Sequence, residues 1–444
     1  GLGNDIYIVD SADDIVIEQA NEGIDEVISS IDYTLVANVD NLSLTGVAAL
    51  NGTGNELSNR LQGNASDNRL DGQGGVDYLW GLEGNDTYVV DNTGDYTIEL
   101  FDQGVDTVES SVTFTLQANV ENLTLIGTAA INGTGNSLDN TLVGNSGANV
   151  LAGGLGNDTY VIGVGDSIVE HANEGMDTVV SGASYTLGDH LENLTLTGTA
   201  AIDGTGNALN NILVGNSGAN TLAGGDGDDT YVVGAGDTIV ESKNGGIDTV
   251  QSEVTWTLDG SLEHLTLIGT SAIDGTGNNG SNILIGNSAA NVLDASGGAD
   301  TLRGGAGDDI VNGGKGNDTY LFGRGDGQDL LQDSGGGDDK ILYDAGINPI
   351  DLVISRQGDD LRLAIHGSTD SVTVQNWYSS SSNRTETIQA GAGEVLLSSQ
   401  VDQLIQAMAQ FTTDTGLSWD AAAGGAGTAQ QQAQFQGILA ANWQ

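Results

Sequence analysis

Single apolar residues recur at every ninth position along much of the chain, separated by residues rich in glycine, asparagine and aspartate. The longest series is Leu284, Leu293, Leu302, Val311 and Tyr320. Roughly three residues of strand followed by six of turn predict a chain that winds into a flattened coil, with one inward side chain per strand. Because such strands stack about 4.8 Å apart, the pattern predicts a parallel β-solenoid.

A longer period overlies the nine-residue pattern. The string GNDIY at 3–7 returns as GNDTY or GDDTY at 84–88, 156–160, 227–231 and 316–320. Successive copies are 81, 72, 71 and 89 residues apart, as expected for a unit of about 71 residues with extra nonapeptides inserted. The tetrapeptide GTGN recurs with steps of 81, 71 and 71, which marks four such long repeats. We expect each long repeat to combine nonapeptide turns with ordinary short strands.

The chain changes character after residue 337. Apolar and polar residues alternate with period two over 351–357, 360–367 and 371–377, which predicts an antiparallel meander. Such a module would cover the end of the solenoid, where unpaired strand edges otherwise invite aggregation.

From residue 397 the apolar spacing becomes three or four, which is typical of an amphipathic helix of about four turns. The apolar positions of this helix are Leu397, Val401, Leu404, Met408 and Phe411. The predicted fold class is therefore all-β. It comprises a right-handed parallel β-solenoid over 1–337, a small antiparallel β cap over 338–395 and a helical tail over 396–444.

The charge balance excludes two classes of partner. The chain has 62 acidic and 10 basic residues, a formal net charge of −52. Residues 1–299 contain only Arg60, Arg69 and Lys243 as basic residues, so neither nucleic acid nor an anionic membrane surface is an expected partner. No apolar run approaches the roughly 20 residues of a membrane span, and without cysteine there are no disulfides or thiolate metal sites. Divalent cations, which prefer oxygen ligands, are the natural counter-charge.

Residues 304–321 read GGAGDDIVN and GGKGNDTYL, two tandem copies of the nonapeptide G-G-x-G-x-D-x-U-x, in which U is a large apolar residue. The chain thereby resembles the RTX (repeats-in-toxin) family of proteins exported by type I secretion. The resemblance covers nearly the whole chain. It implies several bound Ca²⁺ ions, each held between turns that are 18 residues apart.

The resemblance also implies which residues bind calcium. Carried over to this sequence, it pairs Asp300 with Asp318, Asn291 with Asp309, Asn59 with Asp77, Asn68 with Asp86, Asn140 with Asp158, and Asn211 with Asp229. The predicted metal-site residues are Asp300, Asp309, Asp318, Asn291, Asp77, Asp86, Asp158 and Asp229, with the turn glycines Gly304, Gly307, Gly313 and Gly316. We expect the tightest sites at 300–318.

Two alternatives to calcium binding stay open. An aspartate in a glycine-rich turn can cap its own backbone. Many sixth positions hold asparagine, as in 144–152 and 215–223, and asparagines can stack in a hydrogen-bonded ladder without an ion. A second acidic set, outside the nonapeptides, fits either degenerate turns of the same coil or Asx-turns on a solvated edge. Its members are Asp95, Asp106, Asp166, Asp177, Asp237 and Asp248.

No catalytic motif is visible in the sequence, so we expect no enzyme within these residues. The four histidines lack HExxH spacing, and no GxSxG elbow, phosphate-binding loop or cysteine nucleophile is present. The Arg-Gly-Asp tripeptide at 324–326 lies among glycines that favour a turn.

The predicted function is a calcium-triggered folding and secretion module that forms the C-terminal stalk of a large secreted or cell-surface RTX adhesin or exoprotein. One alternative is a structural subunit of a calcium-dependent surface layer or extracellular filament. Another is the secretion tail of an RTX enzyme (a lipase, a protease or a polysaccharide-modifying enzyme) whose catalytic domain lies upstream. Since the chain opens inside a repeat motif, we expect it to be the C-terminal part of a longer protein.

The expected partners are calcium ions, the type I secretion apparatus, and further copies of the chain through calcium. The tail would carry the type I signal, unless its helix merely packs on the cap. The expected location is outside a Gram-negative bacterium, secreted or on the cell surface.

Overall fold

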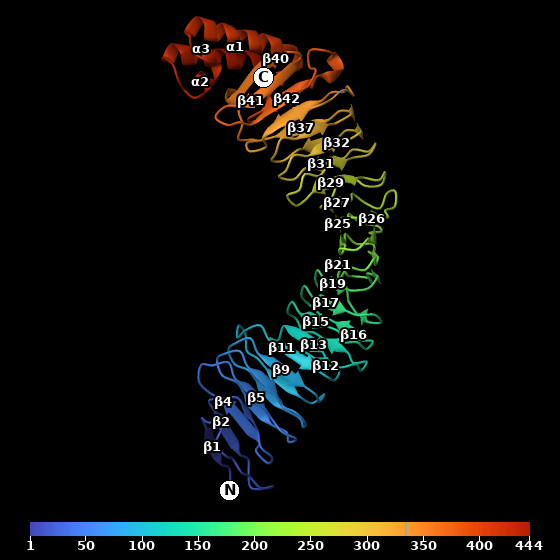
Figure 1. Cartoon of the computed structure of the whole chain (residues 1–444), viewed down its shortest axis with the longest axis vertical. Helices are drawn as coiled ribbons and strands as arrows, with labels where there is room; N and C mark the ends of the chain where they lie inside the picture. The colour runs from blue at the N-terminus through green and yellow to red at the C-terminus, as the bar shows by residue number, and fades with distance from the viewer. Residues whose placement is uncertain (334) are drawn as a thin grey trace. The chain divides into compact units, whose positions relative to one another are not determined.

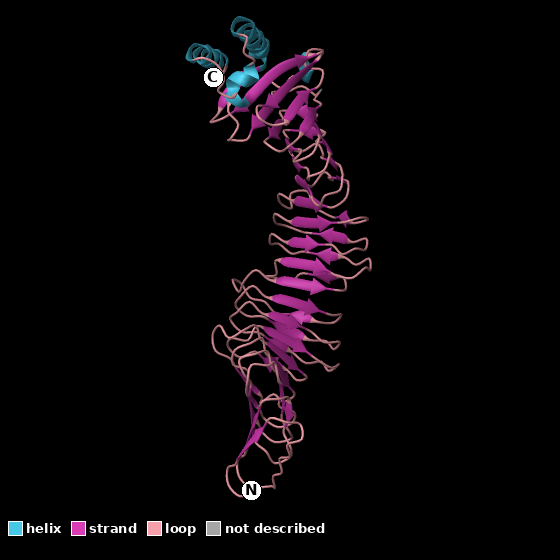
Figure 2. Cartoon of the chain, turned by 60° about the vertical axis from the view of Figure 1, so that its left-hand side comes forward, coloured by secondary structure: helices cyan, strands magenta, loops and turns pink. Residues whose placement is uncertain are grey.

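A computed structural model describes residues 1–333 and 335–444, and nearly all of the regular structure in it is β. The chain forms two compact units, Gly1–Thr221 and Leu222–Gln444. Within each unit, short strands stack in parallel as successive turns of a solenoid (Figures 1 and 2). The predicted all-β parallel solenoid is thereby confirmed.

In the first unit, strands 18 residues apart pair in register. Strand β6 (Arg60–Gln62) pairs in parallel with β8 (Tyr78–Trp80), and Leu61 lies opposite Leu79. Both leucines are fully buried. One inward side chain per three-residue strand is what the nonapeptide spacing predicts, because two nonapeptides complete one turn of the coil.

The ordinary strands of the long repeats continue the same stack. Tyr88 lies opposite Val108, and the column proceeds through Leu123 and Leu142 to Tyr160. All five side chains are fully buried. The core of this unit is therefore a column of single apolar residues, and each level depends on the levels directly above and below it.

The strands of the first unit are β1 (Ile6–Val9), β2 (Glu26–Ser29), β3 (Tyr33–Thr34), β4 (Asn41–Leu44), β5 (Asn51–Thr53), β6, β7 (Arg69–Asp71), β8, β9 (Thr87–Val90), β10 (Tyr96–Ile98), β11 (Thr107–Ser110), β12 (Phe114–Thr115), β13 (Asn122–Leu125), β14 (Gly133–Thr134), β15 (Thr141–Val143), β16 (Val150–Ala152), β17 (Thr159–Ile162), β18 (Ser167–Ile168), β19 (Thr178–Ser181), β20 (Tyr185–Thr186), β21 (Asn193–Leu196), β22 (Gly204–Thr205) and β23 (Ile212–Val214). Strand β24 (Thr221–Ala223) follows.

The second unit has the same construction. Its inward column begins with Tyr231 opposite Val250 and ends with Tyr320, Ile341 and Ile388 on neighbouring strands. The strands are β25 (Thr230–Val233), β26 (Thr238–Ile239), β27 (Thr249–Ser252), β28 (Trp256–Thr257), β29 (His264–Leu267), β30 (Gly275–Thr276), β31 (Ile283–Ile285), β32 (Val292–Asp294), β33 (Gly297–Gly298), β34 (Thr301–Arg303), β35 (Ile310–Asn312), β36 (Lys315–Gly316), β37 (Thr319–Phe322), β38 (Gln328–Leu331), β39 (Lys340–Tyr343), β40 (Leu352–Gln357), β41 (Asp360–Ile365), β42 (Ser371–Val374), β43 (Thr387–Ala390) and β44 (Glu394–Leu397).

The predicted antiparallel meander is formed by β40, β41 and β42. Strand β42 also pairs in parallel with β38, and β43 pairs in parallel with β39 before β44 returns antiparallel to it. The cap therefore grows out of the last solenoid turns: β42 extends the sheet that contains β38, and β43 and β44 extend the sheet that contains β39.

The helices follow the cap: α1 (Val401–Thr415), α2 (Trp419–Ala423) and α3 (Ala429–Asn442). Single 3₁₀ turns lie at Pro349–Asp351, Ser381–Asn383 and Ser398–Gln400. No helix of the described residues is both long and apolar enough to cross a membrane.

Helix α1 buries four of the five apolar positions that predicted it, Val401, Leu404, Met408 and Phe411. The fifth, Leu397, ends β44 and is 40% exposed, so the helical spacing placed the start of the helix too early. Phe411 packs against Trp419 of α2, with ring centroids 5.8 Å apart, which ties the first two helices together.

Candidate metal centres

The sixth-position carboxylates of the nonapeptides stack as hydrogen-bonded ladders along the turns. Asp77 Oδ1 accepts a hydrogen bond from the backbone N–H of Asn59 at 2.7 Å, and the N–H of Asp77 donates to Asp95 Oδ1 at 2.9 Å. Asp86 Oδ1 likewise accepts from the N–H of Asn68 at 2.6 Å. Each carboxylate is thereby held against the backbone of the preceding turn.

The same contact joins other pairs that the sequence analysis predicted. The bonds are Asn140 N–H to Asp158 Oδ1 at 2.7 Å, Asn291 N–H to Asp309 Oδ1 at 2.7 Å, and Asp300 N–H to Asp318 Oδ1 at 2.9 Å. Asn211 and Asp229, the remaining predicted pair, are both buried. The structure thus joins five of the predicted pairs through the same hydrogen bond, from a backbone N–H to the carboxylate 18 residues later.

The other oxygen of these carboxylates is buried without a hydrogen-bond donor. It is the Oδ2 atom of Asp77, Asp86, Asp158, Asp300, Asp309 and Asp318. A buried, unsatisfied charged oxygen is costly, and native structures rarely tolerate one unless an ion or water completes it. Carboxylate oxygens are the ligands that Ca²⁺ prefers, so these atoms fit the cation that the repeats imply.

The predicted glycines have two different tasks. A Cβ atom on Gly304 or Gly313 would overlap the Oδ2 atom of the carboxylate five residues later. Gly307 and Gly316 have φ angles of +130° and +136°, and a Cβ on either would overlap the backbone of the preceding turn. The first pair leaves space beside the carboxylate, and the second lets adjacent turns approach closely.

Burial raises the pKa values of these carboxylates well above the usual range. The pKa is about 7 for Asp77, Asp86 and Asp158, and about 6 for Asp300 and Asp309. Desolvation is the largest cause, neighbouring carboxylates raise the pKa further, and the backbone N–H bond acts in the opposite direction. The ionised form is thus disfavoured unless a positive charge accompanies it.

An asparagine side chain at the sixth position finds hydrogen-bond partners within the protein and needs no ion. Asn149 Nδ2 donates to the carbonyl oxygen of Ile131 at 2.6 Å, and its Oδ1 accepts from the N–H of Asn145 at 2.8 Å. Asn291, a predicted metal-site residue, has the same two kinds of partner in Ile273 and Asn287. Asn291 therefore differs from the aspartates, since both polar atoms of its side chain already have protein partners.

Three of the six members of the second acidic set prove to be part of the ladders. Asp106, Asp177 and Asp248 are at most 1% exposed, and each accepts the backbone N–H of the sixth-position aspartate one turn earlier at 2.8–2.9 Å. They therefore continue the coil, as the first of the two alternatives proposed, and do not lie on a solvated edge.

Sequence reasoning missed the glutamates that join these aspartates. Glu18, Glu99, Glu170 and Glu241 each lie close to two aspartates of their own long repeat. Each stands seven positions before an aspartate, in the pairs Glu18–Asp25, Glu99–Asp106, Glu170–Asp177 and Glu241–Asp248. That constant spacing is the signal that would have found them.

Comparison with known proteins identifies the repeats. Five segments match the RTX calcium-binding nonapeptide repeat, at residues 53–88, 134–169, 205–240, 276–311 and 294–329. Residues 360–389, which include β41 and β42, match the haemolysin-type calcium binding protein related domain.

Two individual proteins are also similar to the chain. The endo-1,3-1,4-beta-glycanase ExsH of Rhizobium meliloti (strain 1021) is 38% identical over 86 residues, which is 19% of this chain and 18% of that protein. The chain therefore matches less than a fifth of the length of this relative. The extracellular lipase LipA from Serratia marcescens aligns over 79% of this chain and 42% of its own, at 16% identity. The TM-score of this alignment is 0.14.

Proposed function

The chain is an RTX-family protein whose nonapeptide repeats bind several Ca²⁺ ions, and from that premise we propose that it is a calcium-triggered folding and secretion module. The observation that carries the proposal is the set of buried Oδ2 atoms that lack a donor, and all of them except that of Asp300 lie beside a glycine that leaves room for a ligand. A chain with these atoms in its core is poorly stabilised until cations reach them.

Calcium when bound supplies positive charge and empty coordination positions to these oxygens. The residues that would hold it are Asp77, Asp86, Asp158, Asp229, Asp300, Asp309 and Asp318. Because ions that bind only the folded chain stabilise it by mass action, calcium binding and folding are one equilibrium. Where calcium is scarce, the net charge of −52 and the unsatisfied carboxylates favour the unfolded chain.

This coupling suits export through a narrow channel followed by folding outside. The proposed carrier of the export signal is the helical tail, 396–444, read by a type I secretion apparatus of a Gram-negative bacterium. We place the folded module outside the cell, secreted or on its surface, as the C-terminal stalk of a large adhesin or exoprotein. Calcium bridging between acidic copies would allow self-association into a layer or filament.

A second candidate function is the secretion tail of an enzyme. The observation that favours it is the 38% identity to a segment of a glycanase from Rhizobium meliloti. In that case the catalytic domain precedes residue 1, and the residues described here retain the same calcium-dependent role.

Export of a reporter tests the proposal. A reporter joined to the N-terminus of this chain is expected in the medium of a Gram-negative host that has a type I exporter, and removal of 396–444 is expected to retain it in the cell. A matched control removes the exporter instead of the tail. Equal export of the full and shortened chains would overturn the secretion half of the proposal.

A further inference from the structure

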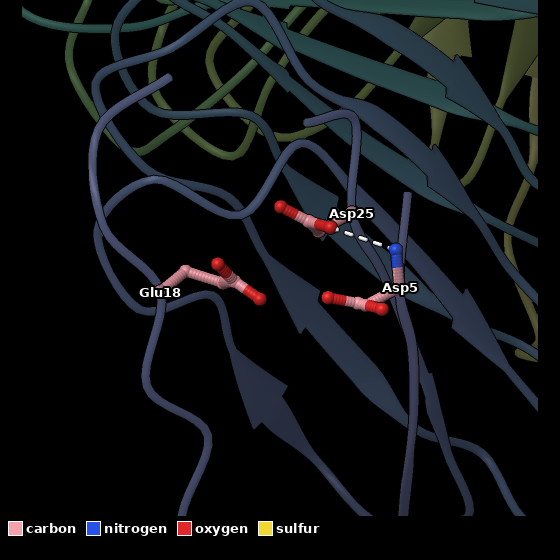
Figure 3. Close-up of side chains that lie close together, drawn as sticks. All are labelled: Asp5, Glu18 and Asp25. Carbon is pink, nitrogen blue, oxygen red and sulfur yellow. Dashed lines mark hydrogen bonds between the residues drawn. The ribbon is translucent and has the colours of Figure 1, made fainter. Parts of the chain in front are cut away.

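One group of three carboxylates recurs in each part of the solenoid. The groups are Asp5, Glu18 and Asp25; Asp86, Glu99 and Asp106; Asp158, Glu170 and Asp177; Asp229, Glu241 and Asp248; and Asp318, Asp333 and Asp339. In every group, one oxygen from each residue lies within 4.8 Å of the others. Figure 3 shows the side chains of the first group directed toward one another. We refer to these groups as carboxylate triads.

The triads differ in composition from the nonapeptide sites. In each group the first aspartate directly precedes one strand, the second acid lies later in the same turn, and the third residue directly precedes the strand of the next turn. The turn between the two aspartates spans 19 to 21 residues in place of 18. The extra residues carry the second acid into the interior, where a regular nonapeptide turn has none.

The triad of Asp86, Glu99 and Asp106 is enclosed on all sides by protein. Its residues are 1%, 6% and 1% exposed. Asp86 Oδ2 and Glu99 Oε2 are buried without a hydrogen-bond donor. The cluster therefore contains two unsatisfied oxygens from side chains that are more than nine-tenths buried, and both belong to residues that converge on one point.

A buried tyrosine orients the glutamate. Tyr88 is fully buried, and its hydroxyl accepts from the backbone N–H of Gly81 at 2.9 Å and donates to Glu99 Oε1. The hydroxyl proton is thereby committed to one carboxylate oxygen, and the other oxygen is left facing the two aspartates. In the last triad, Tyr320 donates to Asp333 Oδ2 at 2.8 Å in the same manner.

No protein cation neutralises the enclosed triad. Among the described residues, the ion pairs of lysine, arginine and histidine all involve other carboxylates.

We propose that the carboxylate triads are a second class of calcium site, one beside each GNDTY-type motif, in which three side-chain carboxylates bind one ion. The inference rests on the proposed function: four triads share Asp86, Asp158, Asp229 or Asp318 with the sites assigned there, and each triad adds its second and third acid as ligands. Ca²⁺ accepts oxygens at about 2.3–2.6 Å, so ligands on opposite sides of one ion lie roughly 4.6–5.2 Å apart. Oxygens that all lie within 4.8 Å of one another are close enough to share one such ion.

The number of bound ions tests the inference. Equilibrium dialysis against radioactive Ca²⁺ measures it for the full chain and for the variant E99Q/E170Q/E241Q. Glutamine keeps an oxygen that accepts from the tyrosine hydroxyl but removes the charge, so this variant is expected to bind three fewer ions. The matched control is E56Q/E83Q/E253Q, which removes the same charge from exposed positions and is expected to bind as many ions as the natural chain.

An unchanged count in E99Q/E170Q/E241Q would overturn the inference, and calcium-dependent folding of that variant would show that the nonapeptide sites act without the triads. If the triple variant fails to fold, the single variant E99Q provides the test. It is expected to bind one ion fewer than the natural chain, and an unchanged number of ions would contradict the inference. Absence of calcium binding in the natural chain would instead overturn the proposed function itself.

Discussion

At the scale of single residues, one atom decides whether a turn needs a cation. Asn291 and Asp309 occupy equivalent positions in successive turns, and the backbone N–H of Asn291 donates a 2.7 Å hydrogen bond to Asp309 Oδ1. The asparagine nitrogen donates to the carbonyl oxygen of Ile273, whereas Asp309 offers a second oxygen that has no donor. Replacing a nitrogen that donates with an oxygen that only accepts therefore converts a self-sufficient turn into one that a cation completes.

The first prediction follows from this difference. The variant D309N/D318N is expected to be more stable than the natural chain in chelator, by about 1–3 kcal/mol for each removed buried charge, and to gain less stability from calcium. Thermal unfolding followed by circular dichroism, with and without calcium, measures both changes. The control D13N/D226N removes two exposed carboxylates. If calcium raised the stability of D309N/D318N as much as that of the natural chain, these aspartates would not be calcium ligands.

The second prediction concerns pH in the absence of calcium. The pKa values of Asp77, Asp86 and Asp158 are raised to about 7 in the folded chain, so these groups bind protons more readily folded than unfolded. Their contribution to stability is therefore present below the unfolded pKa of about 4 and is lost as the pH rises through about 7.

The midpoint of thermal unfolding of calcium-free protein is thus expected to rise as the pH falls from 8 toward 5. Calcium is removed beforehand with a chelating resin, because a soluble chelator binds calcium more weakly as the pH falls. A midpoint that stays constant or falls over this range would mean that the buried carboxylates do not limit the stability of the calcium-free chain.

At the scale of turns and strands, glycine makes room for the ligand. Gly313 has an ordinary φ angle, but a Cβ there would overlap Asp318 Oδ2 and the hydroxyl of Tyr320. The third prediction is that G313A weakens calcium binding and destabilises the calcium-bound fold by about 1–3 kcal/mol, because the new methyl group has no free volume. G346A is the control, since a Cβ at Gly346 meets no atom within 4 Å. Equal calcium affinities for the two variants would contradict the prediction.

The stacking of elements was predictable where spacing is constant. Leu61 opposite Leu79 follows from two nonapeptides per turn, and the meander that contains β41 follows from period-two alternation. The triads were predictable only in part: the constant step of seven residues from glutamate to aspartate was visible, but it does not show that both side chains converge on an aspartate of the preceding turn. Burial of the second acidic set was equally hidden, since nothing in the composition of a turn shows what stacks above and below it.

At the scale of the whole molecule, the charge of −52 comes from exposed and from buried carboxylates, which cations neutralise in different ways. Repulsion between exposed carboxylates is long-ranged, and monovalent salt screens it with a Debye length of about 8 Å at physiological ionic strength. The buried oxygens of Asp86, Asp158 and Asp309 are shielded from that screening and need an ion in direct contact. Calcium is therefore expected to fold the chain, whereas sodium chloride of the same ionic strength is expected to leave it unfolded.

The measurement that tests this account most directly is a calcium titration of the chain, from chelator to about 10 mM, followed by circular dichroism and sedimentation velocity. The account predicts a cooperative gain of β signal and contraction to a compact monomer, neither of which appears in sodium chloride of equal ionic strength. A chain that is already β-folded and compact in chelator would contradict it, because the asparagine ladders and the apolar column would then hold the solenoid without calcium.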